Sequence, residues 1–204
     1  MSALARQKLL TFDEYLDFEA TSPVRHEYHE GRLVEMMAGV SPAHDAVHLT
    51  VASAIRAKLG VKGPCRVHQS GLSLRIDAAD AGFYPDIFVT CDPRDRNSRA
   101  KQWPCLIIEV LSKSTRDYDR GDKFDAYKLI DALSEYVLID TEGQAVSVHR
   151  PLGPGRWESV SLGPSDVLEL HTIGLSLSVE SIYEGADVPL VRPRPKLVAP
   201  IAED

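Results

Sequence analysis

The stretch YPDIFV (residues 84–89), with its companion LIIEVL (residues 106–111), decides how this chain folds. Each is a short apolar run that carries one carboxylate, Asp86 or Glu109, and such runs predict strands buried on at least one face. A buried carboxylate is costly unless a cation or hydrogen bonds compensate it. Two of them on neighbouring strands therefore predict a shared divalent metal ion, and with it hydrolytic phosphate chemistry.

The two acids are predicted to suit one metal ion. Residues i and i+2 share a strand face, so Asp86 lies with Phe88 and Glu109 lies with Ile107. Mg²⁺ and Mn²⁺ bind oxygen, and Mg²⁺ sites usually have one or two protein carboxylates plus waters. The alternative is that each acid forms an ion pair at a strand end. Two acids on two apolar runs favour the metal site.

A site that hydrolyses phosphodiesters also needs positive charge near the phosphate. Lys113 has the strand parity of Glu109, but four residues of strand place it about 13 Å away. Lys123 lies on the next predicted helix, which can fold back over the sheet, and Tyr127 shares its helix face. We therefore favour Lys123. Tyr127 and Lys113 are accessory candidates, and for Lys113 a solvated surface position is the better interpretation.

Three more residues could join the acids. Glu27 could donate a third metal-binding carboxylate from an N-terminal helical segment, although alone it is more typical of a surface acid. His44 and His48 are one helical turn apart, which is metal-ligand spacing, but the HExxH pattern of zinc proteases is absent. His44, in the first turn, could face the acids as an accessory residue, whereas His48 is interpreted as a core histidine.

Composition sets the class of protein. The chain has 204 residues, enough for one domain with a core, and no apolar stretch approaches the roughly 20 residues that span a bilayer. The net charge of −7 argues against a broad nucleic-acid-binding face and leaves room only for a small basic cleft. Cys65, Cys91 and Cys105 form no CxxC pair and are interpreted as free core or near-core thiols. Free thiols and the lack of a signal-peptide pattern predict a cytoplasmic protein.

The local patterns predict a single α/β (α+β) domain over residues 1–184, followed by a Pro-rich C-terminal arm or tail over residues 185–204. Residues 65–69 and 72–76 are predicted to form a hairpin. Helices are expected at residues 12–20, 41–60 and 115–133, with a helical turn at 25–28. Further strands are expected at residues 33–36, 135–140, 145–150, 156–162 and 175–179.

Several motifs in order resemble a known family. They are TFDEYL at residues 11–16, EGRLVEM at 30–36, SPAH at 41–44, YPD at 84–86, IEVLSKST at 108–115 and DRGDKFDAY at 119–127. Together they resemble the bacterial Uma-type restriction endonuclease family, which belongs to the PD-(D/E)XK nuclease superfamily. The resemblance covers about residues 9–184, and it is the order of the motifs that makes it specific.

The resemblance implies a restriction-endonuclease-like central mixed sheet flanked by helices and a phosphodiester-hydrolysing site that uses Mg²⁺ or Mn²⁺. Asp86 and Glu109 match the two metal-binding acids, and Glu27 matches the acid of the N-terminal region. The superfamily lysine normally stands two residues after the second acid, where this chain has Leu111. Lys123, on the next helix, matches a lysine of the family segment at residues 119–127.

The sequence therefore predicts a metal-dependent DNA endonuclease, with Asp86, Glu109 and Lys123 as catalytic residues and Glu27 as a helper in metal binding. DNA is the expected partner, no membrane is involved, and a homodimer is left open. A rival hypothesis is a catalytically inactive binding or assembly protein that keeps the nuclease fold, motivated by the charge of −7 and by Leu111. A third is a structural dimer whose Pro-rich tail docks on a partner.

Overall fold

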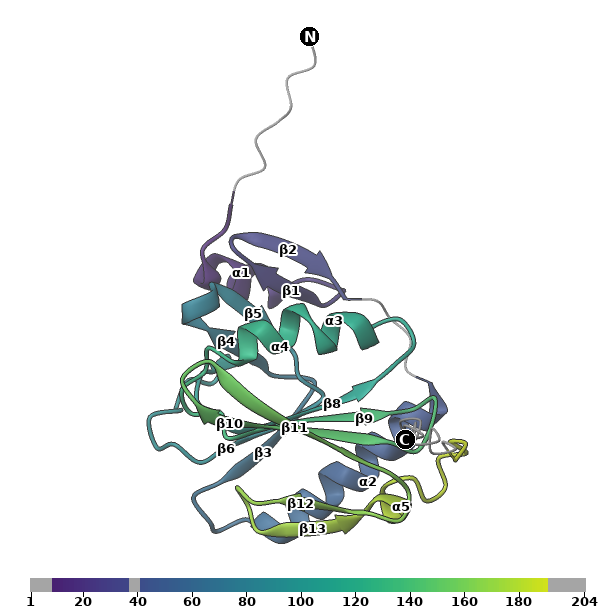
Figure 1. Cartoon of the computed structure of the whole chain (residues 1–204). Helices are drawn as coiled ribbons and strands as arrows, with labels where there is room; N and C mark the ends of the chain where they lie inside the picture. The colour runs from purple at the N-terminus through teal and green to yellow at the C-terminus, as the bar shows by residue number, and fades with distance from the viewer. Residues whose placement is uncertain (1–8, 37–40, 191–204) are drawn as a thin grey trace, which may run out of the picture.

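The computed structural model describes residues 9–36 and 41–190. Two mixed β-sheets are stacked, with short helices between them and further helices on the outer faces (Figure 1). The predicted α/β class, with a central mixed sheet flanked by helices, is confirmed. No helix in the described ranges is long and apolar enough to cross a membrane.

The main sheet has six strands in the order β11-β10-β9-β8-β6-β3. Only β8 and β9 pair in parallel, and the other neighbours are antiparallel. The long central strand β8 is almost wholly buried, which explains its near-continuous apolar sequence. The strands are β3 (Arg66–Gln69), β6 (Ile87–Thr90), β8 (Pro104–Leu111), β9 (Glu135–Asp140), β10 (Val146–Gly153) and β11 (Arg156–Leu162).

A second, N-terminal sheet of five strands lies at the top of Figure 1, in the order β2-β1-β5-β4-β7. Its members are β1 (His26–His29), β2 (Arg32–Glu35), β4 (Ser73–Ile76), β5 (Ala81–Phe83) and β7 (Ala100–Lys101). A short 3₁₀ turn, Asp77–Ala79, joins β4 to β5. A separate hairpin is made by β12 (Val167–Leu170) and β13 (Leu175–Ser178).

Local capping signals place the two longest helices. Thr11 and Glu14 form the expected capping box at the start of α1 (Phe12–Glu19). Ser41 caps α2 (Pro42–Leu59). This helix begins with proline, which is common at the first helical position because an N–H there would have no partner within the helix. The remaining helices are short: α3 (Arg116–Arg120), α4 (Asp122–Tyr127) and α5 (Val179–Ile182).

The two faces of the main sheet have different covers. One face packs on α2, α5 and the β12–β13 hairpin, and Val51 and Ile55 of α2 are fully buried there. The other face packs on the N-terminal sheet and α4, with Phe83 and Tyr127 fully buried. Ile107 and Leu111 belong to this second core, so Glu109, which shares their parity on β8, points toward α4 and the N-terminal sheet.

The predicted hairpin of residues 65–69 and 72–76 is wrong, because its two strands belong to different sheets. β3 pairs with β6, whereas β4 pairs with β5 and β7. The chain crosses between the sheets at Ser70, whose backbone N–H donates to the carbonyl of Asp86 over 3.1 Å. Alternation along a strand predicts which face is buried, but it does not predict the partner strand.

The predicted helix over residues 115–133 forms only in part. It divides into α3 and α4 at Gly121, whose φ of −107° and ψ of −100° are not helical. After Tyr127 the chain continues in turns, although Ile130 and Leu133 still bury their side chains. The predicted helical turn at residues 25–28 is also wrong, since strand β1 occupies that segment.

Cys65 and Cys91 form a disulfide, so the prediction of three free thiols is wrong for this pair. Cys65 precedes β3 and Cys91 follows β6, and the antiparallel pairing of Arg66 with Thr90 brings them opposite each other. The disulfide was missed because β3 was assigned to the wrong partner strand. Cys105 is free and partly buried, and its Sγ lies 3.6 Å from that of Cys91.

The predicted boundary at residue 185 stays a prediction. Ala186 and Val188, just after it, are buried against the core under α2. Residues 191–204, which make up most of the expected arm, lie outside the described residues.

Candidate active site

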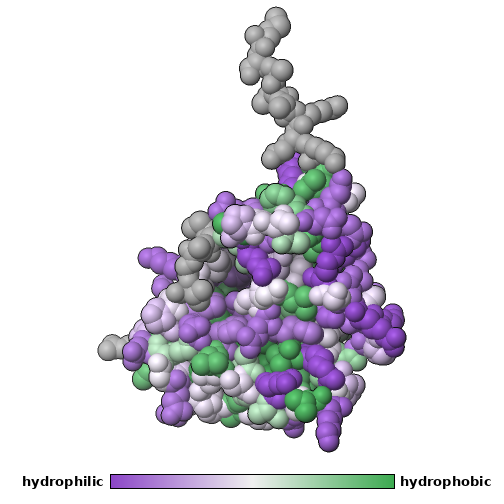
Figure 2. All heavy atoms as spheres, turned by 180° about the vertical axis from the view of Figure 1, so that it is seen from behind, coloured by the Kyte–Doolittle hydropathy of each residue, from purple (hydrophilic) through white to green (hydrophobic). Residues whose placement is uncertain are grey.

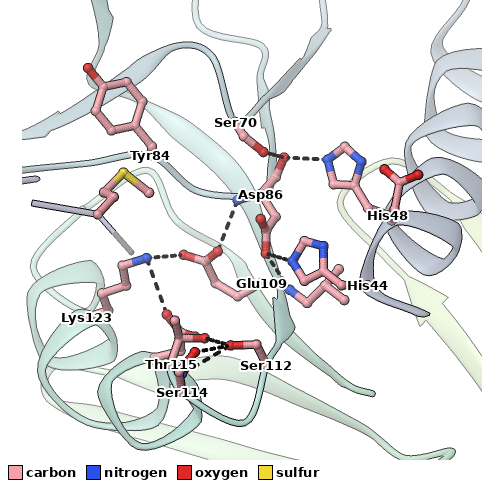
Figure 3. Close-up of a pocket in the computed structure, with 14 residues that line it drawn as sticks. His44, His48, Ser70, Tyr84, Asp86, Glu109, Ser112, Ser114, Thr115 and Lys123 are labelled. Carbon is pink, nitrogen blue, oxygen red and sulfur yellow. Dashed lines mark hydrogen bonds and ion pairs between the residues drawn. The ribbon is translucent and has the colours of Figure 1, made fainter. Parts of the chain in front are cut away.

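Asp86 and Glu109 meet across two neighbouring strands. Asp86 stands just before β6, and the next residue pairs with Ile108 of β8. The backbone N–H of Asp86 donates to Glu109 Oε2 over 3.0 Å, and the N–H of Val110 donates to Asp86 Oδ2 over 2.8 Å. Each acid is therefore held by the backbone of the other strand, as Figure 3 shows.

Lys123 reaches the same place from α4, which folds back over the sheet. Its Nζ lies 3.3 Å from Glu109 Oε1, and the Tyr127 hydroxyl donates to that oxygen over 2.9 Å. The ammonium also lies 3.1 Å from Glu27 Oε1 and 3.3 Å from Asp119 Oδ1. The Lys123 side chain is only 7% exposed, so this is a buried cluster of one cation and three acids.

Two histidines from the start of α2 hold Asp86 from the other side. His44 Nε2 lies 3.3 Å from Asp86 Oδ2, and His48 Nε2 lies 3.0 Å from the Asp86 carbonyl oxygen. His44 thus faces the acids, as expected. His48 contacts the site backbone as well, so the interpretation of a core histidine was incomplete. His44 Nδ1 is buried without a hydrogen-bond partner among the described residues.

Burial and neighbouring charges set the protonation states. Burial raises the pKa of Glu109 to about 8; Lys123 opposes this, and the charges of Asp119 and Asp86 add to it. Burial would lower the pKa of Lys123, but the nearby carboxylates outweigh it and hold that pKa well above its usual value. Burial would also raise the pKa of Asp86, yet the His44 contact keeps it below its usual value. Lys123 is therefore a permanent cation at neutral pH.

These groups open onto a cavity of about 340 Å³, and the surface seen from behind is hollowed (Figure 2). Asp86, Glu109 and Lys123 line the cavity together with both histidines. Among the described residues, Glu27, Tyr127 and Lys113 do not belong to its lining. Side chains with hydroxyl groups form much of the remaining wall: Ser70, Tyr84, Ser112, Ser114 and Thr115.

The donor set fits an open divalent-metal site. Among the described residues, no group of three or more His, Cys, Asp or Glu side chains is placed to hold a metal ion. Mg²⁺ usually keeps several waters and one or two carboxylates, so a set of three side chains is not needed. Asp86 Oδ1 receives no hydrogen bond from any described residue, which leaves it free for a ligand.

Glu27 is placed differently from a metal ligand. Its Oε1 pairs with Lys123, and its Oε2 accepts from the Tyr118 hydroxyl over 2.8 Å. Both oxygens are thus occupied behind the lysine. Its role as a third metal ligand stays a prediction, without support from this placement.

Comparisons with known proteins agree with this architecture. Residues 12–180 match the model of the Uma2 family, which is described as "Putative restriction endonuclease". The chain belongs to the Uma2 family. The resemblance expected from the motifs is therefore confirmed.

Relatives of this Uma2 protein include two uncharacterized proteins of Synechocystis sp. One, slr1290, is 36% identical over 177 residues, covering 86% of this chain and 92% of its own. The other, sll1609, is 31% identical over 160 residues, covering 77% and 89%. A crystal structure from Anabaena variabilis, titled as a "putative nuclease belonging to DUF820", has a TM-score of 0.68 at 20% identity and covers 87% of this chain and 99% of its own. It shows a shared fold.

The Uma2 site differs from the simplest superfamily pattern at Leu111. That side chain is fully buried in the core between the two sheets, so no cation stands there. The structure brings Lys123, the cation favoured from the sequence, to Glu109, and its catalytic role stays a prediction. Sequence reasoning missed Asp119 and Tyr118. Asp119 lies four residues before Lys123, a spacing that would bring the two side chains together on one face of the helix predicted at residues 115–133. That spacing was the available signal.

Proposed function

We propose that this Uma2 protein is a DNA endonuclease that hydrolyses phosphodiester bonds with a divalent metal ion, Mg²⁺ or Mn²⁺. One observation carries the proposal. Asp86 and Glu109 are locked together by reciprocal backbone hydrogen bonds at a cavity wall, with a buried ammonium 3.3 Å from Glu109. Two carboxylates and one cation are the chemical parts that metal-assisted phosphate hydrolysis requires.

Asp86 and Glu109 would hold the metal ion between them. When bound, such an ion lowers the pKa of a coordinated water and stabilises charge on the phosphate. His44 and His48 fix Asp86 from the side of α2, and Tyr127 fixes Glu109 from α4. The acids are thus oriented before a substrate arrives, which avoids reorganisation during the reaction.

Lys123 supplies a fixed positive charge at the same wall. Because the nearby carboxylates hold its pKa well above the usual value, it acts as a cation and not as a proton acceptor. Phosphate oxygens can also accept hydrogen bonds from the hydroxyls of Ser112, Ser114 and Thr115, which line the same cavity. Such contacts position a backbone without reading its sequence.

The rival hypothesis, an inactive binding or assembly protein, rests on Leu111 and on the net charge of −7. The nearness of Lys123 to Glu109 weakens the first point, since an ammonium is available from α4. The charge still counts against a wide DNA-binding face. A metal-binding measurement separates the two hypotheses.

The test is cleavage of supercoiled, linear and single-stranded DNA with Mg²⁺ or Mn²⁺, each compared with a chelator control. The wild type should cleave only with metal, and Asp86→Ala should lose both cleavage and Mn²⁺ binding in calorimetry. Asp92→Ala, beyond the other end of β6, is the matched control and should keep both. Equal cleavage by Asp86→Ala and the wild type would indicate a contaminating nuclease and overturn the proposal.

A further inference from the structure

We propose that Lys123 is held against Glu109 by two positioning carboxylates, Glu27 and Asp119, which we call the lysine clamp. The inference deepens the proposed function, and its catalytic consequence rests on it. The contacts of the clamp do not depend on the proposed function, because they concern only how this chain orients the ammonium of Lys123. It also gives Glu27 a role that explains why this acid lies outside the cavity.

The clamp surrounds the ammonium of Lys123 with carboxylates. A lysine head group has three N–H donors and no acceptor. Nζ of Lys123 lies 3.1 Å from Glu27, 3.3 Å from Glu109 and 3.3 Å from Asp119. The contact with Glu109 is a hydrogen bond and the contacts with Glu27 and Asp119 are ion pairs, so three carboxylates hold the ammonium in place. Figure 3 shows the ammonium of Lys123 directed at Glu109.

Glu27 is itself fixed by a second layer of contacts. The Tyr118 hydroxyl donates to Glu27 Oε2 over 2.8 Å, and it lies 2.6 Å from His29 Nε2. Because the hydroxyl has only one proton, which goes to Glu27, His29 must be the donor to Tyr118. Glu27 Oε1 is then left for Lys123 alone.

The clamp joins elements that are far apart in the fold. Glu27 belongs to β1 of the N-terminal sheet, and Asp119 belongs to α3. Glu109, against which the lysine is held, belongs to β8 of the main sheet. All three side chains are no more than 6% exposed, so water cannot easily replace them. The N-terminal sheet therefore completes the catalytic wall although it contributes no cavity acid.

A positioning role has a specific kinetic signature. Glu27 does not line the cavity, and Asp119 directs one oxygen at the lysine. Loosening either one should misplace the ammonium without removing the metal-binding acids. Since a displacement of about 1 Å can cost roughly 100-fold in rate, kcat should fall while KM and metal affinity are kept.

The first experiment measures the lysine itself and needs no catalytic activity. Full-length protein is acetylated with an activated ester, and the rate at Lys123 is followed by peptide mass spectrometry, with exposed Lys113 as the internal reference. Tyr118→Phe and Asp119→Asn should label Lys123 roughly 10-fold faster than the wild type, because each loses one charge-assisted contact of the clamp. Tyr118→Phe keeps the ring, so it tests the clamp with little change in packing.

The matched control is Glu135→Gln, which weakens a different buried acid–cation pair. Glu135 is 1% exposed and lies 2.9 Å from Arg150, without contact to the cavity. This variant should leave the Lys123 rate unchanged. Equal Lys123 rates in the wild type, Tyr118→Phe and Asp119→Asn would overturn the clamp, and so would equally faster labelling in Glu135→Gln.

The second experiment connects the clamp to cleavage. In the plasmid assay, Tyr118→Phe and Asp119→Asn should lower kcat by roughly 10-fold or more with KM unchanged. Mn²⁺ affinity by calorimetry should also be unchanged, whereas loss of Mn²⁺ binding in Asp119→Asn would make Asp119 a metal ligand and overturn its positioning role. If the wild type cleaves no DNA but the labelling pattern holds, the proposed function fails and the clamp stands.

Discussion

Two glutamates lie buried on neighbouring parallel strands, and their surroundings differ. Glu135 of β9 is 1% exposed and accepts hydrogen bonds from Arg150, from the backbone of His171, and from Thr172. Glu109 of β8 is 2% exposed and accepts from one backbone N–H, one tyrosine and one lysine. Its further neighbours are other acids, and it borders a cavity.

The surroundings of the two glutamates show how a buried acid with a structural role can be told from one at a candidate active site. Both are equally hidden from water, so burial alone does not distinguish them. Glu135 has its own nearby cation and donors from three residues, which is the usual compensation for a buried charge. Glu109 shares one cation with Glu27 and Asp119, so the cluster holds three acids for one cation. Such a surplus is favourable when a divalent cation joins it.

The largest expected effect is on cleavage. Glu109→Gln should lower the metal-dependent cleavage rate on the order of 10⁴-fold, because it removes one of the two carboxylates that we propose as metal ligands. Glu135→Gln should cleave within a few-fold of the wild type once both are folded. The measurement is the initial rate of cleavage of supercoiled plasmid with Mn²⁺. Comparable losses of cleavage rate in the two variants would show that the two acids do not differ in function.

The next effect is on stability, and here the order reverses. Glu135→Ala should lower the free energy of unfolding by about 3–5 kcal/mol, since it leaves the paired Arg150 without its partner. Glu109→Gln should change it by about 1 kcal/mol or less in metal-free protein at pH 5, where the folded protein holds Glu109 protonated and the amide replaces a neutral carboxyl. Urea unfolding with a chelator measures both. A larger loss for Glu109→Gln would mean that Glu109 is chiefly structural.

The sequence predicted those features correctly that depend on neighbouring residues or on the alternation of side chains along a strand. The capping box at Thr11 and the N-cap at Ser41 formed as expected, because their partners are three residues away. The facing of Asp86 and Glu109 followed from two apolar runs that had to pair. Lys123 was chosen over Lys113 because a helix after a buried strand can fold back, whereas four residues of strand lead away.

What could not be predicted depended on distant partners. The strand before Ser70 pairs with β6 and the strand after it with β5, so a hairpin seemed equally consistent with the local pattern. The Cys65–Cys91 disulfide followed from that pairing and was missed with it. Asp119 was missed because an acid four residues before a lysine is typical of solvated helix faces too. Its burial depends on where α3 packs.

A smaller effect should appear in the pH dependence of stability. The pKa of Glu109 is raised to about 8 in the folded protein, against 4.5 for the ordinary group. The folded state then binds more protons than the unfolded state between these values, so its advantage is full below 4.5 and is lost as pH rises toward 8. One group contributes at most about 1.4 kcal/mol per pH unit.

Metal-free wild type and Glu109→Gln should therefore diverge as pH rises, with the variant showing the flatter curve. Urea unfolding from pH 5 to pH 8 in a chelator gives both curves. Parallel curves for the wild type and Glu109→Gln would show that Glu109 does not titrate in this range.

The smallest expected effect is that of replacing Lys113, the lysine that we did not favour as the cation near the phosphate. Lys113 is exposed, lies outside the cavity lining and makes no described ion pair. Lys113→Ala should change the free energy of unfolding by less than about 0.5 kcal/mol, as usual for such surface positions. Cleavage should keep its kcat, with at most a small rise in KM from one lost phosphate contact. A fall in kcat matching that of Lys123→Ala would instead place Lys113 at the scissile phosphate, and Glu109 would then be served by a cation from its own strand end.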